Sequence, residues 1–181
     1  MAEGFYFPPL YRLLEQPPQG WAQVKGSAQH PDVLGRVRFY QTAYGVVVIA
    51  EFTGLPVAEK ACAEPIFAFH IHEGFSCTGD ASDPFADVGA HYNPQGCEHP
   101  YHAGDLVPLF GARGYAYAVF LTDRFTVREV IGKAVILHRG RDDFTTQPSK
   151  NAGEKMACGE IFGRERSGVS RGGNERKKKK F

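Results

Sequence analysis

Six of the seven histidines in this 181-residue chain fall into three separated segments, and these segments limit which folds the chain can adopt. The first segment holds His70 and His72, and the third ends at His138. The second segment holds His91, His99, His102 and Asp105. Imidazole nitrogen and carboxylate oxygen are common ligands of transition metals. The pattern therefore predicts two adjacent metal sites built from distant parts of the chain.

The rest of the chain has the character of short strands joined by turns. Glycine and proline are frequent, with 21 and 12 residues, and no long stretch has the periodicity of a helix. Eight short runs are strand-like, at 21–28, 35–42, 45–54, 66–72, 105–110, 114–121, 133–138 and 155–162. Ala43 and Tyr44, next to Gly45, predict a hairpin turn between the second and third runs. Many short antiparallel strands favour an all-β sandwich or barrel.

Charge and composition divide the chain into three parts. Residues 1–20 are predicted to be an irregular arm, residues 21–163 one domain, and residues 164–181 a disordered basic tail. The tail carries eight basic and two acidic residues, which leaves residues 1–163 at about −5 out of a total of +1. The folded part is therefore not expected to bind nucleic acid. The start of the chain lacks the features of a signal peptide, and no run is long enough for a membrane span.

The paired histidines of the first segment suit a metal half-site. Side chains two residues apart on a strand point to the same face, so His70 and His72 project together while Phe69 and Ile71 face the core. His138 ends an apolar strand and can supply a third nitrogen from a neighbouring strand. The seventh histidine, His30, lies beside Pro31 in a predicted turn and is not assigned to a site.

The long segment from Glu73 to Gly104 has no apolar periodicity, and a loop of this length is usually functional or disordered. Its histidines favour a loop ordered by metal. His99, His102 and Asp105 are spaced by three and supply three ligands of a tetrahedral zinc site. His91 is the natural fourth ligand, and its second ring nitrogen could also serve the first site and bridge two metals.

Five segments in order resemble the copper/zinc superoxide dismutase family. They are Phe69-His-Ile-His-Glu-Gly74, Gly89-Ala-His-Tyr-Asn-Pro94, His102-Ala-Gly-Asp-Leu106, Val135-Ile-Leu-His138 with Asp142-Asp143, and Asn151-Ala-Gly-Glu-Lys-Met-Ala-Cys-Gly159. The resemblance implies an eight-stranded Greek-key β-barrel or sandwich with a long metal-binding loop. It also implies an enzyme that converts superoxide to oxygen and hydrogen peroxide by cycling copper between Cu(II) and Cu(I), beside a structural zinc.

The resemblance assigns roles residue by residue. The implied copper ligands are His70, His72, His91 and His138, and the implied zinc ligands are His91, His99, His102 and Asp105. His91 would bridge the metals and leave copper on reduction to take up a proton. Asp142 matches a carboxylate that links one ligand of each metal. Cys77 and Cys158 match a disulfide pair, with the cysteine placement of bacterial members.

Two positions depart from the family pattern. Lys155 stands where the family places an arginine beside the copper channel; it keeps the charge that attracts superoxide but lacks the planar guanidinium. His99 and His102 are only three apart, where many members have a longer insertion. We expect any functional difference to arise from these two features, because the ligand set is complete.

Several alternatives remain open from the sequence. Cys62 and Cys97 lie outside the family pattern and form either a second disulfide or two free thiols. The alternative function is a non-catalytic protein that binds or buffers copper and zinc. The family contains monomers and dimers, so a homodimer is one expectation, and the 164–181 tail is either a solvated charge run or a tether to polyanions. A cytoplasmic location is favoured because no signal peptide is seen, although disulfides usually indicate an oxidising compartment.

Overall fold

A computed structural model describes residues 10–60, 62–63, 65–147 and 152–164. Residues 1–9 of the arm and 165–181 of the basic tail lie outside the described residues. The elements are α1 (Leu10–Leu14), β1 (Gly20–Gly26), β2 (Leu34–Thr42), β3 (Gly45–Thr53), β4 (Ile66–Phe67), β5 (Phe69–His72), η1 (Ala86–Val88), β6 (Leu109–Phe110), β7 (Ala116–Thr122), α2 (Val127–Val130), β8 (Ala134–His138) and β9 (Lys155–Gly163).

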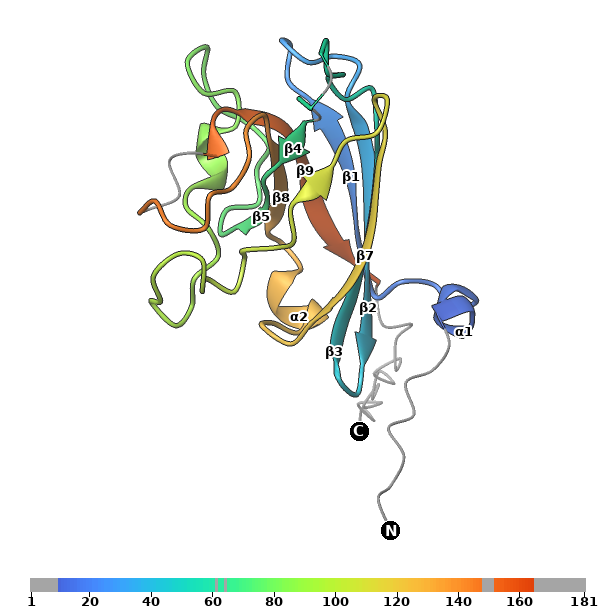
Figure 1. The fold of residues 1–181 in the computed structure, drawn as a ribbon. Helices are drawn as coiled ribbons and strands as arrows, with labels where there is room; N and C mark the ends of the chain where they lie inside the picture. The colour runs from blue at the N-terminus through green and yellow to red at the C-terminus, as the bar shows by residue number, and fades with distance from the viewer. Residues whose placement is uncertain (1–9, 61, 64, 148–151, 165–181) are drawn as a thin grey trace, which may run out of the picture.

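Most of the strands belong to one antiparallel sheet, in the order β5-β8-β9-β1-β2-β3-β7. β4 and β6 form a separate two-stranded antiparallel pair. Figure 1 shows the large sheet curled like half of a barrel, with the long loops gathered on one side of it. The prediction of an all-β, barrel-like fold is confirmed. The predicted runs at 21–28, 35–42, 45–54, 114–121, 133–138 and 155–162 correspond to β1, β2, β3, β7, β8 and β9. The predicted run at 105–110 is wrong over most of its length, because only Leu109–Phe110 pairs with another strand.

β3 is buried on both faces. Val46, Val48, Ala50 and Phe52 alternate along it and enter the main core. Val47 and Ile49, which lie between them, pack with Tyr40 on the outer face, where Leu13 of α1 lies against them. Fully burying an apolar side chain of this size contributes about 1.5–3 kcal/mol to stability. The prediction that residues 1–20 are irregular is therefore wrong for Leu10–Leu14, which form a helical turn whose Leu13 packs on this outer apolar surface.

One predicted strand, at 66–72, is divided in the structure. Ile66–Phe67 pairs with β6, whereas Phe69–His72 pairs with β8. Ala68 lies between them, where its N–H donates to the Gly140 carbonyl and its carbonyl accepts from the His138 N–H. The break therefore brings the end of β8, with His138, beside the strand that carries His70.

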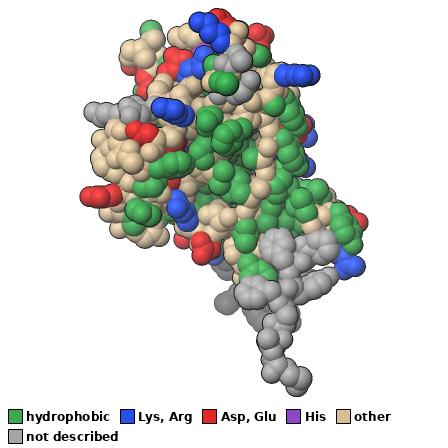
Figure 2. Space-filling view, viewed as in Figure 1, with side chains coloured by type: hydrophobic (Ala, Val, Ile, Leu, Met, Phe, Trp, Pro, Cys, Tyr) green, Lys and Arg blue, Asp and Glu red, His purple; other side chains and the backbone are tan. Residues whose placement is uncertain are grey.

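β7 lies at one end of the sheet order and has an exposed apolar outer face. Tyr117, Val119 and Leu121 alternate on this face and are all exposed. Figure 2 shows hydrophobic side chains gathered over the region where β6 and β7 lie. None of the helices in the described ranges has both the length and the apolar content needed to cross a membrane.

Candidate metal centre

Backbone pairing aligns the first two histidine segments. Isolated β-bridges join His70 to Asp105 and His72 to His91. The Ile71 N–H donates to the Gly104 carbonyl at 2.8 Å, and the Ile71 carbonyl accepts from Tyr92 N–H at 2.8 Å. A Cβ on residue 104 would lie 2.2 Å from the Ile71 carbonyl oxygen, so only glycine allows this approach. The segment from 91 to 105 is thereby folded against β5, which brings His91 and Asp105 beside the paired histidines.

The third segment reaches the same place through β8 and β9. His138 ends β8, and a register shift between Leu137 and His138 places His138 opposite Lys155 of β9. Irregularities of this kind re-aim side chains and are common beside functional sites. Lys155 is therefore the cross-strand neighbour of a candidate ligand.

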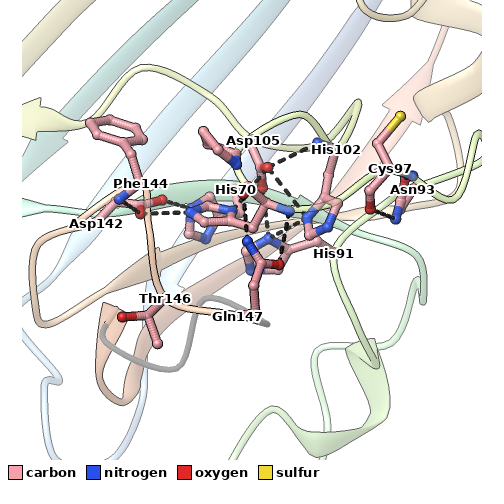
Figure 3. A network of polar contacts seen from close by, with 12 residues as sticks. His70, His91, Asn93, Cys97, His102, Asp105, Asp142, Phe144, Thr146 and Gln147 are labelled. Atoms are coloured by element: carbon pink, nitrogen blue, oxygen red, sulfur yellow. Dashed lines mark hydrogen bonds and ion pairs between the residues drawn. The ribbon is translucent and has the colours of Figure 1, made fainter.

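The structure brings four histidines into a first group. One ring nitrogen each from His70, His72, His91 and His138 lies within 4.8 Å of the others. Three of these side chains are buried, and His91 is partly exposed. Figure 3 shows His70 and His91 side by side in this region. The same four residues were expected as a set from the sequence.

Hydrogen bonds orient the rings of the first group. His72 Nδ1 lies 2.9 Å from the Gly89 carbonyl oxygen, and His138 Nδ1 lies 3.2 Å from the Gly153 carbonyl oxygen. A carbonyl oxygen only accepts, so both Nδ1 atoms carry the proton and both Nε2 atoms keep a lone pair. Those two Nε2 atoms are buried and have no hydrogen-bond partner within the part of the chain that the structure describes.

His70 shows the same arrangement with its nitrogens exchanged. Its Nε2 lies 2.7 Å from Oδ2 of Asp142, while its Nδ1 is buried and has no hydrogen-bond partner among the described residues. Leaving a buried polar atom unpaired costs about 1–3 kcal/mol. Three such nitrogens on neighbouring rings therefore indicate a ligand that completes them.

Burial keeps these rings neutral. It lowers the pKa of His70 to about 4, although the hydrogen bond to Asp142 opposes the shift. Burial, with the nearby His70 ring, lowers the pKa of His138 to about 3. Burial and the nearby His91 also lower the pKa of His72. A neutral ring offers its lone pair to a metal without first losing a proton.

A second group surrounds the carboxylate of Asp105. The Nδ1 atoms of His91, His99 and His102 lie 2.7, 3.0 and 3.3 Å from its oxygens. Burial favours the neutral form of Asp105, but the hydrogen bond with His91 and the three nearby rings outweigh it and lower its pKa. His91 belongs to both groups, because its ring is 4.0 Å from that of His70 and 5.4 Å from that of His102, between centroids.

Asp142 connects the two groups from the other side. Its Oδ2 faces His70, and its Oδ1 lies 2.8 Å from Nε2 of His99 and 2.9 Å from the backbone nitrogen of Phe144. Burial favours protonation, but these hydrogen bonds lower the pKa of Asp142 and hold it ionised. Figure 3 shows Asp142 and Asp105 on opposite sides of His70.

The four cysteines form one disulfide bond and leave two free thiols. Cys77 and Cys158 form a disulfide that joins the long loop to β9. Cys62 and Cys97 are free and exposed, so of the two alternatives left by the sequence the structure has the separate thiols.

Some residues that support the site were not predicted from the sequence. The Gln147 side chain accepts from the His99 N–H and donates to the His99 carbonyl, at 3.1 and 2.6 Å. Arg124 Nη1 donates to the carbonyls of Pro100, His102 and Asp105, at 2.9, 3.3 and 3.1 Å. Neither residue has a local sequence signal, because both reach the 99–105 segment from distant positions.

The donor sets suit two different metals. Four imidazole nitrogens fit copper, and three imidazole nitrogens with one carboxylate fit a closed tetrahedral zinc site. A pocket of about 460 Å³ has Asp105 in its wall but is lined by no histidine. This pocket therefore offers no imidazole ligands, and the candidate metal sites are the two histidine groups.

Comparison with known proteins agrees with this geometry. The sequence model of the copper/zinc superoxide dismutase (SODC) family matches residues 33–161. The protein named superoxide dismutase (Cu-Zn) 2 of Aquifex aeolicus is 29% identical over 145 residues, covering 72% of this chain and 80% of that protein. The superoxide dismutase (Cu-Zn) of Legionella pneumophila is 30% identical over 148 residues, covering 77% and 85%.

The fold is also similar to that of a solved structure. The crystal structure of a double mutant of a SOD-like protein from Bacillus subtilis matches with a TM-score of 0.64 and 26% identity. The match covers 79% of this chain and 97% of that chain.

Proposed function

Because the chain belongs to the copper/zinc superoxide dismutase family, we propose that it is an oxidoreductase that converts superoxide to oxygen and hydrogen peroxide. The observation that carries the proposal is the set of three buried imidazole nitrogens, on His70, His72 and His138, that have no hydrogen-bond partner among the described residues. They lie together in a group that also includes His91. A protein that needed these rings only for packing would have paired those nitrogens.

We assign copper to the first group and zinc to the second. Copper would be held by Nδ1 of His70, Nε2 of His72, Nε2 of His138 and a ring nitrogen of His91. Zinc would be held by Nδ1 of His91, His99 and His102 with a carboxylate oxygen of Asp105. His91 would then serve both metals through its two nitrogens.

Bound copper supplies one-electron chemistry, in which one superoxide is oxidised to oxygen and a second, with two protons, is reduced to hydrogen peroxide. The protein's part is to orient the rings, move a proton and admit the anion. The Gly89 and Gly153 carbonyls and Asp142 hold the protons of His72, His138 and His70 on the nitrogens that face away from the group. An acceptor that binds the N–H on the far side of a ligand ring raises the basicity of the ligating nitrogen and fixes the orientation of the ring.

His91 is the residue best suited to carry a proton. It is a member of both groups and is only partly buried, unlike His70 and His138. One ring nitrogen faces Asp105, so the opposite nitrogen would take up a proton when His91 is released from the first group. That proton would then pass to the reduced dioxygen.

The test measures superoxide decay by pulse radiolysis in the presence of protein loaded with one copper and one zinc per chain. Wild type and His138→Ala are compared under the same conditions. We expect wild type to accelerate decay by several orders of magnitude over the uncatalysed reaction, and His138→Ala to lose nearly all of this. His30→Ala is the matched control, because His30 is outside both groups and should keep both metals. Decay by loaded wild type no faster than in buffer would leave a metal-buffering protein as the better description.

A further inference from the structure

A pocket of about 330 Å³ has His138 of the first histidine group in its wall. Its charged lining consists of Asp83, Glu154 and Lys155. The pocket wall thus carries two carboxylates and one ammonium group. A small anion that approaches His138 meets a mixed field rather than a positive one.

The ammonium of Lys155 is already engaged. Its Nζ contacts Oδ2 of Asp83 in an ion pair and donates to the Phe85 carbonyl at 3.3 Å. The Lys155 side chain is 17% exposed, whereas that of Asp83 is 39% exposed. The Lys155 side chain therefore lies against the loop that contains Asp83 and Phe85, and the carboxylate of Asp83 neutralises its charge.

The loop holds Asp83 in place for this contact. Oδ1 of Asp83 accepts from the Phe85 N–H at 3.1 Å, and its backbone N–H donates to Oδ1 of Asp80 at 3.0 Å. This leaves Oδ2 directed to Lys155. The Cys77–Cys158 disulfide joins the same loop to β9, which carries Lys155 three residues before Cys158. The disulfide thus ties the loop that carries Asp83 to the strand that carries Lys155.

We propose that Asp83 is a specificity-determining residue that holds Lys155 against the pocket wall and weakens the attraction of small anions to the copper site. The inference rests on the proposed function, because it concerns access to the copper of that centre. An unpaired cation at the entrance of a low-dielectric pocket raises the local concentration of anions, whereas a compensated one does so much less. Asp83 acts through Lys155 and is a positioning residue.

The experiment is an azide titration of the copper- and zinc-loaded protein, followed through the copper absorption bands, for wild type and Asp83→Asn. Asparagine keeps the oxygen that accepts from Phe85 but removes the charge opposite Lys155. We expect azide to bind at least about threefold more tightly to Asp83→Asn, and the difference to shrink as ionic strength rises. Asp83→Ser is a second variant in case asparagine disturbs the loop, because serine also keeps an acceptor for the Phe85 N–H. It should likewise tighten azide binding.

Two further variants separate a specific effect from a general one. Glu154→Gln removes the same charge from the same pocket, but Glu154 contacts His30 instead of Lys155, so its effect should be clearly smaller. In a Lys155→Met background, Asp83→Asn should no longer tighten azide binding. Equal gains from Asp83→Asn with and without Lys155, equal gains from Glu154→Gln, or no gain at all would each overturn the proposal.

The outcomes distinguish this inference from the proposed activity. Azide binding does not depend on turnover, so tighter azide binding without catalysed superoxide decay would support the role of Asp83 and contradict the activity. Unchanged azide affinity with rapid decay would contradict the role of Asp83 alone. A metal-free readout is the nuclear magnetic resonance signal of the Lys155 ammonium, which should lose protection from hydrogen exchange in Asp83→Asn. Equal protection in both proteins would also overturn the proposal.

Discussion

The Nε2 atom of His70 lies 2.7 Å from Oδ2 of Asp142, and both side chains are almost completely buried. The other oxygen of the same carboxylate lies 2.8 Å from Nε2 of His99. His70 belongs to the first histidine group and His99 to the second, so one carboxylate joins the two candidate metal sites without belonging to either. Its position couples the orientation of one ring in each site.

The coupling through Asp142 predicts a loss of affinity at both sites. Asparagine at this position presents an N–H group to one of the two rings, so it cannot accept from His70 and His99 together. We expect Asp142→Asn to weaken copper and zinc binding about 10- to 100-fold each, measured by competition with a chelator. Asp143→Asn is the matched control, because Asp143 accepts from the backbone of Thr145 and Thr146. Weakening of one metal only would contradict the coupling.

Arg124 should control the retention of zinc. One of its nitrogens donates to three carbonyls of the 99–105 segment, and hydrogen bonds from a charged group contribute about 1.5–3 kcal/mol in favourable cases. We expect Arg124→Gln to release zinc to a chelator about tenfold faster while copper affinity changes little. Arg128→Gln, an exposed change in α2, should release zinc at the wild-type rate. Equal release by both variants would remove Arg124 from this role.

The buried histidines make the metal-free protein sensitive to acid. The pKa of His70 is about 4 and that of His138 about 3 in the folded chain, against 6.5 for an ordinary histidine. Below 6.5 the unfolded chain binds protons that the folded chain excludes, so stability falls as pH drops from there towards 4. Each ring contributes a slope of up to about 1.4 kcal/mol per pH unit. The lowered pKa values of Asp105 and Asp142 act in the same direction at more acidic pH.

Urea unfolding of the metal-free protein measures this dependence. The free energy of unfolding should decrease between about pH 7 and about pH 5, and His138→Gln should reduce the slope. A flat profile, or a protein that becomes more stable on acidification, would show that the rings are not held neutral.

The Cys77–Cys158 disulfide should stabilise the fold. It closes a loop with a sequence separation of 81, and removal of a native disulfide usually costs about 2–5 kcal/mol. We expect Cys77→Ser/Cys158→Ser to lower the free energy of unfolding by this amount in denaturant titrations. Cys62→Ser/Cys97→Ser removes two exposed thiols and should leave it within about 0.5 kcal/mol of wild type. Equal losses in the two double variants would contradict the assignment.

Much of this architecture follows from local sequence patterns. Strand-like runs bounded by turn residues predicted the long strands, and the turn at Ala43 and Tyr44 is confirmed by the pairing of Thr42 with Gly45. Gly45 adopts a φ of 127° there, which explains the glycine. The spacing of two residues between His70 and His72 predicted their common face, with Phe69 and Ile71 in the core.

Other features depended on contacts between distant residues. The break at Ala68 follows from a change of strand partner, which no local pattern records. α2 was missed although Thr126 and Glu129 form a capping box, a signal present in the sequence. Lys155 was expected beside the copper channel, but its partner Asp83 lies 72 residues earlier and was not identified.

The central claim is that two metal sites share His91, and the most direct test is the copper and zinc content per chain of three single variants after loading and dialysis. His138→Ala should lose copper and keep zinc, His102→Ala should lose zinc and keep copper, and His91→Ala should lose both. These outcomes follow from the two groups of ligand atoms, in which His91 is the common member. Retention of either metal at the wild-type level by His91→Ala would contradict the claim.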